Sequence, residues 1–511
     1  MPAEPKFPAP DPREVDPRAV RRAFARAAAT YDAAAALQRE VGARMAARLD
    51  VVKLAPAAIL DAGCGTGEAV GELAARYSGA RVVALDVALP MILANVSVPL
   101  VGIADAAAVG HLDDPLSLAG VAVGATVFSV LFTALNFLRM GTTGLAAQAH
   151  GARDADGGRA VLRQGLVVAL ALAALLLVAS GPVEALALAL IDPGPAVAAE
   201  ASAYISIRIW GAPATLSLFV LTGWFIGRGD ARSPLAIVLT VNLVNVALDF
   251  ALVWGAGMRA DGVASATVAA EYLGMALGLA LARRHLVKGP PASGDAGRPG
   301  YRRYLALNFP LFIRTTALML SFAFLTAMGA RFGSAVLAAN ALLLNFFYLA
   351  AYALDGFANA AESLVGRAVG ARDRAGLERA VRLSAQWTLG VAVALSALFA
   401  AGGWLAIDLM TSQQELRELA RAYLPWLVVG PLVGCWAYLY DGIFVGATLN
   451  RQMRDTMLFA ALVVYLPAWW LLRPLGNHGL WLAFTLFLAG RGAAQWWVLR
   501  RLRRRGGLLP A

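Results

Sequence analysis

Charged residues are scarce in this 511-residue chain. Asp, Glu, Lys and Arg together make up only 15% of it, and 59% of the residues are hydrophobic, whereas a typical soluble domain contains about 25% charged residues. A soluble chain of this length would divide into domains with polar surfaces, so the missing charge indicates that much of the surface faces lipid. The composition predicts a polytopic membrane protein and excludes a soluble protein with a single core.

Cysteine is almost absent. Cys64 and Cys435 are the only two cysteines, and they are too few and too far apart in the sequence to indicate a disulfide framework. Positive charge, by contrast, is in excess, with a formal net charge of +11. Such an excess can indicate nucleic-acid binding, but its placement along the chain decides between that function and a role in membrane topology.

The chain has two unlike parts. Residues 1–87 alternate charged helical stretches with short apolar strands and contain no segment long enough to cross a bilayer, so we expect this part to be cytosolic. From residue 88 onward, apolar segments of about the 20 residues that a membrane span needs recur almost to the end. Twelve such segments cover residues 88–110, 119–147, 160–180, 196–227, 233–254, 262–283, 303–330, 335–366, 382–402, 418–447, 456–474 and 478–499.

The distribution of arginine predicts the orientation, because Lys and Arg are retained on the cytoplasmic side of a membrane. The loops after the even-numbered segments and the C-terminal tail are rich in arginine, ending in the run Arg500 to Arg505. The opposite loops hold little beyond Arg259, Arg331 and Arg473. Both termini are therefore predicted to be cytoplasmic. The positive charge is mostly topological, so nucleic acid is not an expected partner.

An internal repeat divides the twelve segments into two halves. A shift of 219 residues superposes the tetrapeptide Gly-Ala-Arg-Asp at 151–154 on the same tetrapeptide at 370–373, and it also superposes Tyr204, Gly211, Gly223, Phe225 and Gly227 on Tyr423, Gly430, Gly442, Phe444 and Gly446. Six segments is an even number, so both halves enter the membrane in the same sense and form parallel repeats. We expect an N-lobe at 88–283, a polar cytoplasmic linker at 284–302 and a C-lobe at 303–505, around a central cleft typical of a transporter.

Two prolines lie at nearly corresponding positions of the repeat. Pro90 and Pro310 match at a shift of 220 residues, near the starts of the first and seventh segments. A proline there either permits a bend, because it removes a backbone hydrogen bond, or simply begins a helix in its first turn.

Polar residues inside the N-lobe segments are candidates for function, because a charged group at the bilayer centre costs about 2.5–3.5 kcal/mol on insertion scales. Asp105 lies in the first segment, Asn245 and Asp249 lie on one face of the fifth, and Thr267 lies in the sixth. Two carboxylates, an amide and a hydroxyl suit Na⁺ or a proton shared between buried carboxylates. Alternatively, the two acids lie near an interface and are simply solvated.

The C-lobe has its own intramembrane acids. Asp355 and Glu362 lie seven residues apart on one face of the eighth segment, and Asp441 lies near Tyr438 in the tenth. Acids and aromatic rings in a cleft suit an organic cation, although the rings also fit an aromatic belt at the membrane interface. Arg314 in the seventh segment and Arg139 in the second are candidates to neutralise these acids.

Four stretches make the chain resemble the multidrug and toxin extrusion (MATE) family, and within it the DNA-damage-inducible subgroup. They are Ala88 to Asp105, Val109 to Leu112, Phe137 to Asp154 and Leu354 to Glu362. The resemblance covers about residues 86–505. It implies a bacterial inner-membrane antiporter in which protons or Na⁺ enter as a drug-like substrate leaves. It also assigns Asp105, Asn245, Asp249 and Thr267 to the cation site of the N-lobe, while foreign sequence replaces the family's polar segment before the first span.

The N-terminal part resembles a different family. Residues 58–67 read as a strand that ends in a glycine-rich turn, a helical stretch follows, and a second strand ends at Asp86. This pattern, with residues 18–31 and 37–41, is similar to the start of the S-adenosylmethionine-dependent malonyl-carrier-protein methyltransferase. The resemblance implies that Asp61, Gly63, Gly65 and Asp86 would contact the cofactor. It stops after Asp86, and the missing strands lead us to expect neither methylation nor tight cofactor binding.

The sequence thus predicts an all-α polytopic membrane protein with twelve transmembrane helices in two parallel six-helix repeats, preceded by a truncated α/β Rossmann-like methyltransferase fragment. We expect a monomeric, cation-coupled multidrug exporter that needs no cofactor. Two alternatives remain open at this stage. A lipid-linked precursor flippase would share the repeat but would be expected to line its cleft with cationic residues, and a membrane-tethered methyltransferase would need catalytic parts that are missing after Asp86.

Overall fold

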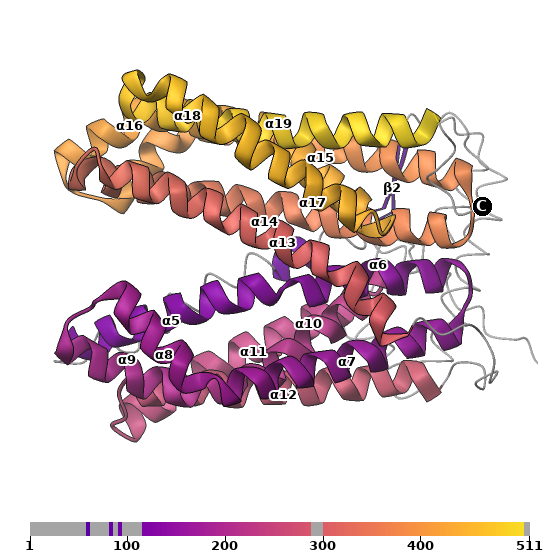
Figure 1. Cartoon of the computed structure of the whole chain (residues 1–511), viewed down its shortest axis with the longest axis horizontal. Coiled ribbons are helices and arrows are strands. Elements are labelled where there is room, and N and C mark those ends of the chain that lie inside the picture. The colour runs from indigo at the N-terminus through magenta and orange to yellow at the C-terminus, as the bar shows by residue number, and fades with distance from the viewer. Residues whose placement is uncertain (1–57, 62–80, 85–89, 95–114, 288–299, 505–511) are drawn as a thin grey trace, which may run out of the picture. The chain divides into compact units, whose positions relative to one another are not determined.

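The computed structural model describes residues 58–61, 81–84, 90–94, 115–287 and 300–504 (Figure 1). The chain divides into two units, Met1–Asp86 and Val87–Ala511.

The described part of the first unit is a pair of strands. β1 (Ala58–Asp61) and β2 (Arg81–Ala84) run parallel, with Ile59 opposite Val82. Parallel neighbours require a crossover connection, usually a helix. The helix expected between the strands lies outside the described residues, as do Gly63, Gly65 and Asp86, and Asp61 is the last residue of β1.

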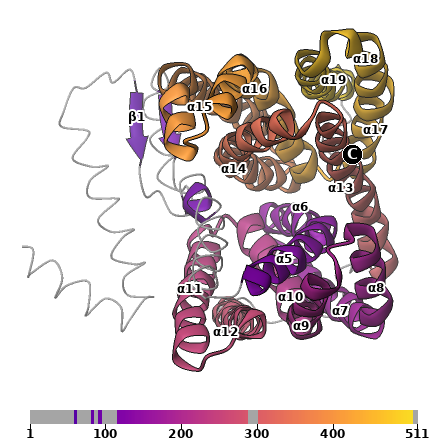
Figure 2. The same ribbon diagram turned by 90° about the vertical axis from the view of Figure 1, so that its left-hand side faces the viewer.

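The described part of the second unit is helical, and each half of the sequence forms its own bundle of roughly aligned helices, seen end-on in Figure 2. The N-terminal half is the lower bundle of Figure 1. It consists of α5 (Pro115–Leu135), α6 (Phe137–Gly151), α7 (Ala155–Val178), α8 (Ser180–Ile191), α9 (Pro195–Arg208), α10 (Ala212–Gly227), α11 (Arg232–Asp249) and α12 (Ala260–Val287).

The C-terminal half begins with a helix that contacts both bundles, since α13 (Tyr301–Ala330) packs against α17 (Asn450–Phe459) in its own half and against α6 in the other. The remaining helices form the upper bundle of Figure 1. They are α14 (Ser334–Gly370), α15 (Arg374–Met410), α16 (Gln414–Gly446), α17 (Asn450–Phe459), α18 (Leu466–Leu472) and α19 (Gly476–Arg504).

Ten segments in the described part are long and apolar enough to cross a membrane. The last, Asn450–Arg504, has 55 residues. As one straight helix it would be roughly 80 Å long, against a hydrocarbon core of about 30 Å. It instead turns back at Gly476, whose φ is 60°, so that α18 packs against α19. These segments contain the residues of the second to twelfth predicted spans. Of the first, only residues 90–94 are described, and they are helical.

The helices also contain features that apolar length did not predict. α8 is an additional apolar helix of 12 residues between the third and fourth spans, too short to cross a bilayer. A π-helical turn follows α11 at Phe250–Gly255, and another follows α17 at Ala460–Tyr465. Pro310 lies inside α13, which begins at Tyr301, so the alternative that Pro310 starts its helix is wrong.

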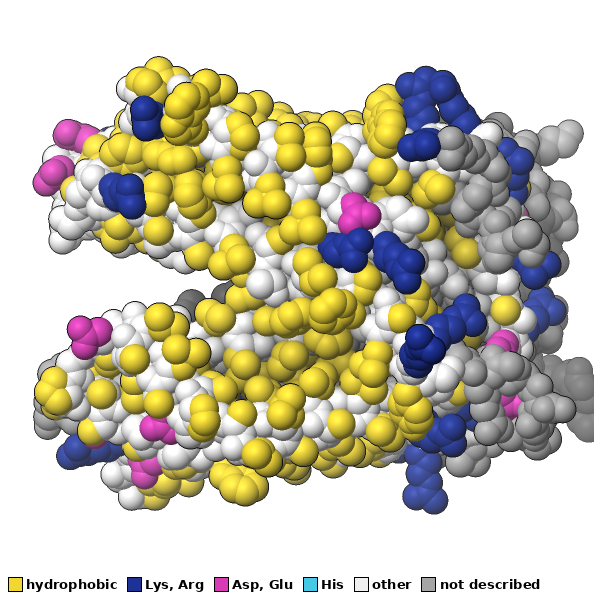
Figure 3. All heavy atoms as spheres, in the orientation of Figure 1, with side chains coloured by type: hydrophobic (Ala, Val, Ile, Leu, Met, Phe, Trp, Pro, Cys, Tyr) yellow, Lys and Arg dark blue, Asp and Glu magenta, His cyan; other side chains and the backbone are white. Residues whose placement is uncertain are grey.

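Many side chains on the face drawn in Figure 3 are apolar. Val178 is 84% exposed and Leu409 is 81% exposed, a pattern that would destabilise a soluble protein but suits contact with lipid tails. Cys435 is buried and free. The fold is therefore that of a helical membrane protein.

The two halves repeat the same turn after their second helix. Arg153 and Arg372 both adopt the left-handed conformation, with φ of 55° and 54°. The next residue, Asp154 or Asp373, then caps the following helix by accepting a hydrogen bond from the backbone N–H of Gly157 or Gly376, at 2.8 Å in each case. The tetrapeptide recurs in both halves because it ends one helix and caps the start of the next.

The repeated glycines mark close contacts between helices within each half. A Cβ built on Gly223 of α10 would lie 2.4 Å from the carbonyl oxygen of Arg139 on α6, and a Cβ on Gly442 of α16 would lie 2.4 Å from that of Ala358 on α14. Because no side chain fits at that distance, only glycine lets these helix pairs approach so closely. Both contacts are related by the shift of 219 residues, so the repeat extends to the packing.

Candidate functional site

The N-terminal half contains a buried group of oxygen-bearing side chains between α11 and α12. Asn245 and Asp249 are each 1% exposed and lie one turn apart on α11. The amide Nδ2 of Asn245 donates a hydrogen bond to Thr267 Oγ1 on α12 at 3.2 Å, and Thr267 Oγ1 donates to the carbonyl oxygen of Val263 at 2.9 Å. The structure therefore brings Asn245 and Thr267 into contact and places Asp249 one turn further along the same helix.

Two features of this group suit a small cation. Within the described residues, the side-chain oxygen of Asn245 accepts no hydrogen bond although it is buried, and buried acceptors are normally satisfied. The π-helical turn of α11 starts directly after Asp249, and such turns occur frequently at functional sites. Asp105, the fourth predicted member, lies outside the described residues.

A buried ion pair, which sequence reasoning did not identify, lies one turn further along α12. Glu271 accepts hydrogen bonds from Arg208 of α9, at 2.6 and 3.0 Å, and from the hydroxyl of Thr215 on α10, at 2.7 Å. The guanidinium of Arg208 also lies 5.1 Å from the ring centroid of Phe132. Two opposite charges in separate apolar segments were visible in the sequence, but their pairing depends on how α9 and α12 pack.

The C-terminal half has a larger charged cluster, centred on Asp441 of α16. The carboxylate accepts hydrogen bonds from Arg314 of α13 and Arg491 of α19 through one oxygen, and from the Gln495 amide at 2.7 Å through the other. Arg314 is 7% exposed and Asp441 is 6% exposed. Arg491 and Gln495 were not among the predicted residues. Arg491 is the one charged residue inside the last predicted span, which is the signal that could have found it.

Asp355 and Tyr438 lie next to this cluster. Arg491 lies over the Tyr438 ring, with its guanidinium carbon 5.7 Å from the ring centroid. Asp355 of α14 is half-buried and interacts electrostatically with Arg139, Arg314 and Arg491. Among the described residues, Asp355 forms no ion pair within 4.0 Å, which distinguishes it from Asp441.

Glu362 belongs to a second polar contact, which joins the two halves. Arg139 of α6 donates a hydrogen bond to the side-chain oxygen of Asn359 on α14 at 2.8 Å, and its guanidinium lies 3.7 Å from Glu362 Oε2. Glu362 is 2% exposed. The three acids Asp355, Glu362 and Asp441 thus face the three arginines Arg139, Arg314 and Arg491, so the cluster has no net formal charge.

The halves meet closely at one end of the helices. A Cβ on Gly151 would lie 2.0 Å from the carbonyl oxygen of Arg367, and a Cβ on Gly370 would lie 2.0 Å from that of Gln148. Gln148 also donates a hydrogen bond to the carbonyl oxygen of Gly446 at 3.0 Å. At the opposite end, the two bundles separate around an open cleft, visible between the upper and lower halves in Figure 3. The arginine-rich end is the closed one.

A helical membrane protein of two repeated halves, with a cleft between them and buried charges in each, has the architecture of a transporter. The chain belongs to the MatE family, whose model matches residues 90–251 and 310–470, one match in each half. It is therefore a secondary transporter and not an enzyme.

Comparison with curated and solved proteins agrees with this assignment. The chain is 43% identical over 428 residues to the DNA damage-inducible protein F of Escherichia coli strain K12, a match that covers 82% of this chain and 92% of that protein. A solved structure described as the outward-facing conformation of a multidrug resistance MATE family transporter has the same fold. Its TM-score is 0.75 at 20% identity, over 82% of this chain and 95% of that one.

The N-terminal part is similar to a different protein. Over 78 residues, the chain is 62% identical to the malonyl-[acyl-carrier protein] O-methyltransferase of Methylovorus sp. strain MP688. The match covers 15% of this chain and 26% of that enzyme, so about a quarter of the enzyme is represented. Both predicted resemblances are confirmed.

Proposed function

We propose that the chain is a multidrug exporter in which protons or Na⁺ enter as a drug-like organic compound leaves. The observation that carries the proposal is the buried group of Asn245, Asp249 and Thr267. An acid inside an apolar helix costs about 2.5–3.5 kcal/mol on insertion scales, and such residues mark ion pathways. We place Asp105 of the first span in the same site. Amide, hydroxyl and carboxylate oxygens suit Na⁺, and paired carboxylates suit a shared proton.

In the proposed cycle, the cation enters this site from the open cleft and biases the N-terminal half toward one arrangement of its helices. Substrate then leaves outward, and release of the cation to the cytoplasm resets the transporter for the next substrate. The proposal includes twelve spans, both termini on the cytoplasmic side of the bacterial inner membrane, and a monomeric transporter. The close contacts at the arginine-rich end support an outward-facing arrangement in this structure, because that end would be cytoplasmic.

The variant Asp249→Asn tests cation coupling. We expect it to abolish ethidium extrusion from cells while the protein remains folded, because the amide cannot take up a proton or hold Na⁺ through a negative charge. Asp192→Asn is the matched control, since Asp192 is exposed at the end of α8 in a left-handed conformation that asparagine tolerates. Unchanged extrusion by Asp249→Asn would refute the proposed site.

Purified transporter in proteoliposomes separates the two coupling ions. We expect one of the two imposed gradients, of protons or of Na⁺, to drive substrate movement. We expect no movement when neither gradient is imposed. Substrate movement that is indifferent to both gradients would contradict antiport altogether.

For the substrate cleft we propose Asp355, Glu362, Asp441, Arg314 and Tyr438, with Asp355 as the residue that meets a cationic group. The ion pairs of Glu362 and Asp441 support this division of roles. The charge of a carboxylate that is paired with arginine is already compensated, so it attracts a cationic ligand less strongly. We expect Asp355→Asn to lower transport of a cationic dye more than that of a neutral compound of similar size. Equal loss of both would make Asp355 a structural residue.

A lipid-linked precursor flippase is the second candidate, and one observation favours it. The cluster contains three arginines, Arg139, Arg314 and Arg491, and guanidinium groups bind phosphate well. Proteoliposomes with a fluorescent lipid-linked phosphate in the outer leaflet discriminate the two functions. Translocation of that lipid without cation-driven dye transport would favour the flippase.

For the N-terminal segment we propose that no cofactor is needed and that S-adenosylmethionine is not bound tightly. The match to about a quarter of the methyltransferase supports this, because a Rossmann-like sheet needs further strands to cover the adenine. Calorimetric titration of the full chain with S-adenosylmethionine is the test, and low-micromolar binding would overturn the proposal.

A further inference from the structure

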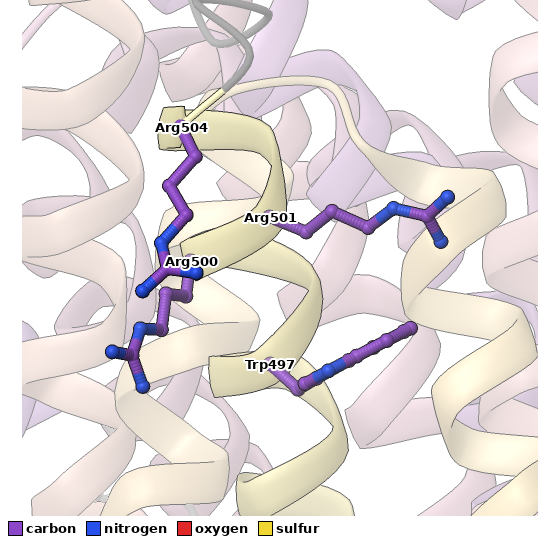
Figure 4. Close-up of a pocket in the computed structure, with 4 residues that line it drawn as sticks. All are labelled: Trp497, Arg500, Arg501 and Arg504. Atoms are coloured by element: carbon purple, nitrogen blue, oxygen red, sulfur yellow. The ribbon is translucent and has the colours of Figure 1, made fainter.

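A surface hollow of about 360 Å³ lies at the C-terminal end of α19 (Figure 4). Trp497, Arg500, Arg501 and Arg504 line it. They are spaced at i, i+3, i+4 and i+7, so they share one face of the helix. In Figure 4, Arg500 and Arg504 lie beside each other along one edge of this face, and Arg501 and Trp497 extend from its opposite edge.

The arginines of this α19 hollow have no acidic partner in the described part of the chain. α19 contains no Asp or Glu from Gly476 to Arg504. Two arginines of the hollow instead lie over tryptophan rings, since the guanidinium carbon of Arg500 lies 5.1 Å from the Trp496 centroid and that of Arg501 lies 5.5 Å from the Trp497 centroid. Stacking on a ring uses the face of a guanidinium and leaves its N–H donors, which lie in the plane, available for an anion.

The hollow lies at the arginine-rich end of a segment that is long and apolar enough to cross a membrane. α19 is part of a candidate membrane span, and Trp496 and Trp497 are 46% and 56% exposed on its surface. Tryptophan is enriched at the level of the lipid headgroups because its ring is apolar and its N–H is polar. Arg504 follows Trp497 by two helical turns, so tryptophans at the headgroup level would place the arginines near the lipid phosphates.

We propose that the α19 hollow binds the phosphate of an anionic phospholipid headgroup. The planar guanidinium groups match the oxygens of a phosphodiester, and the Trp497 ring offers an apolar surface to the glycerol and the first methylenes of the acyl chains. A free phosphate ion would use the arginines but not the ring, which is why the lipid is the better match. Basic residues at a membrane surface also attract anionic lipids over a longer range.

Arg503 is the arginine that distinguishes binding in the hollow from the general attraction of anionic lipids to a basic helix end. It lies on the same helix end and is exposed, but it does not line the hollow. The positive-inside pattern explains arginines at this end of the helix, but it predicts the same lipid affinity whichever arginine is removed. A specific binding site predicts that removing Arg501 and Arg504 lowers the affinity more than removing Arg503.

Native mass spectrometry of the detergent-solubilised full chain tests the proposal. Dioleoylphosphatidylglycerol is the probe and dioleoylphosphatidylcholine the neutral comparison. The double variant R501Q/R504Q is compared with R503Q, and size-exclusion profiles verify that all remain folded. We expect the wild type and R503Q to retain phosphatidylglycerol, phosphatidylcholine to be retained weakly, and R501Q/R504Q to lose binding by roughly tenfold or more, since each arginine contributes a several-fold increase in affinity.

Two results would overturn the proposal. A loss of affinity per removed arginine that is the same in R503Q as in R501Q/R504Q would reduce the effect to net charge. Displacement of phosphatidylglycerol by equimolar inorganic phosphate would make the hollow a site for free anions. The phosphate competition uses the wild-type chain, so it decides the question even if the double variant does not fold.

Discussion

At the residue scale, a main feature of this transporter is that several of its buried charges are paired. Asp441 is held by Arg314 and Arg491, and Glu271 is held by Arg208. Removing one partner from a buried pair leaves an uncompensated charge, which costs much more than the pair itself contributes. The pairs therefore constrain how the helices of each half assemble, whatever their part in transport.

The variant Asp441→Asn should destabilise the protein by about 3–5 kcal/mol, because the buried guanidinium groups of Arg314 and Arg491 lose the one carboxylate that contacts them among the described residues. The free energy of unfolding can be measured by SDS titration in mixed micelles with circular dichroism. Asp455→Asn is the matched control, since Asp455 is 61% exposed and pairs with Arg454. The control should lose about 0–1 kcal/mol. Similar losses in both variants would contradict the described pairing.

The hydrogen bond between Arg139 and Asn359 leads to a second prediction at the residue scale. The hydrogen bond between these residues joins α6 to α14 across the two halves. We expect Asn359→Ala to weaken the closed end, so transport slows or substrate leaks while each half stays folded. The leak can be measured as dye entry into proteoliposomes without a gradient. Asn340→Ala, within the C-terminal half and bonded to Asn477, should instead lower thermal stability without a leak.

At the element scale, glycine decides where the two halves can close. Gly151 and Gly370 each meet a backbone carbonyl of the other half, at equivalent places in the repeat. A backbone atom cannot rotate away as a side chain can, so the contact admits no Cβ. The pseudo-symmetry means that one substitution in each half acts on the same closed end.

Gly151→Ala and Gly370→Ala should each open the arginine-rich end. Overpacking costs about 1–3 kcal/mol, which corresponds to roughly a five- to 150-fold shift in the balance between closed and open states. Spin labels at the exposed positions 152 and 371 would report the change as a longer distance in electron paramagnetic resonance. Gly158→Ala and Gly390→Ala are controls with nothing within 4 Å of the new methyl group, and they should leave the distance unchanged.

At the scale of the whole molecule, the transporter and the N-terminal segment are separate units. The family match lies entirely within the second unit, and the methyltransferase similarity spans 78 residues. This division explains why the average composition understates how apolar the transporter is.

Deleting residues 1–87 should therefore leave drug export unchanged within about twofold, because the residues proposed for the cation site and the cleft all lie after residue 87. Ethidium extrusion, normalised to the amount of protein in the membrane, is the measurement. Loss of transport at equal membrane abundance would show that the segment contributes to function, and a loss of abundance alone would assign it a role in insertion or folding.

The sequence by itself determined the membrane class and the repeat, because apolar length and repeated residues are local properties that can be read along the chain. It also singled out Asn245, Asp249 and Thr267, because a polar side chain in an apolar helix is conspicuous without a structure. Only the tertiary structure decided which charges pair, that Arg139 reaches Glu362 across the halves, and which end is closed. Those features depend on distances between helices far apart in the sequence, and no periodicity within one helix encodes them.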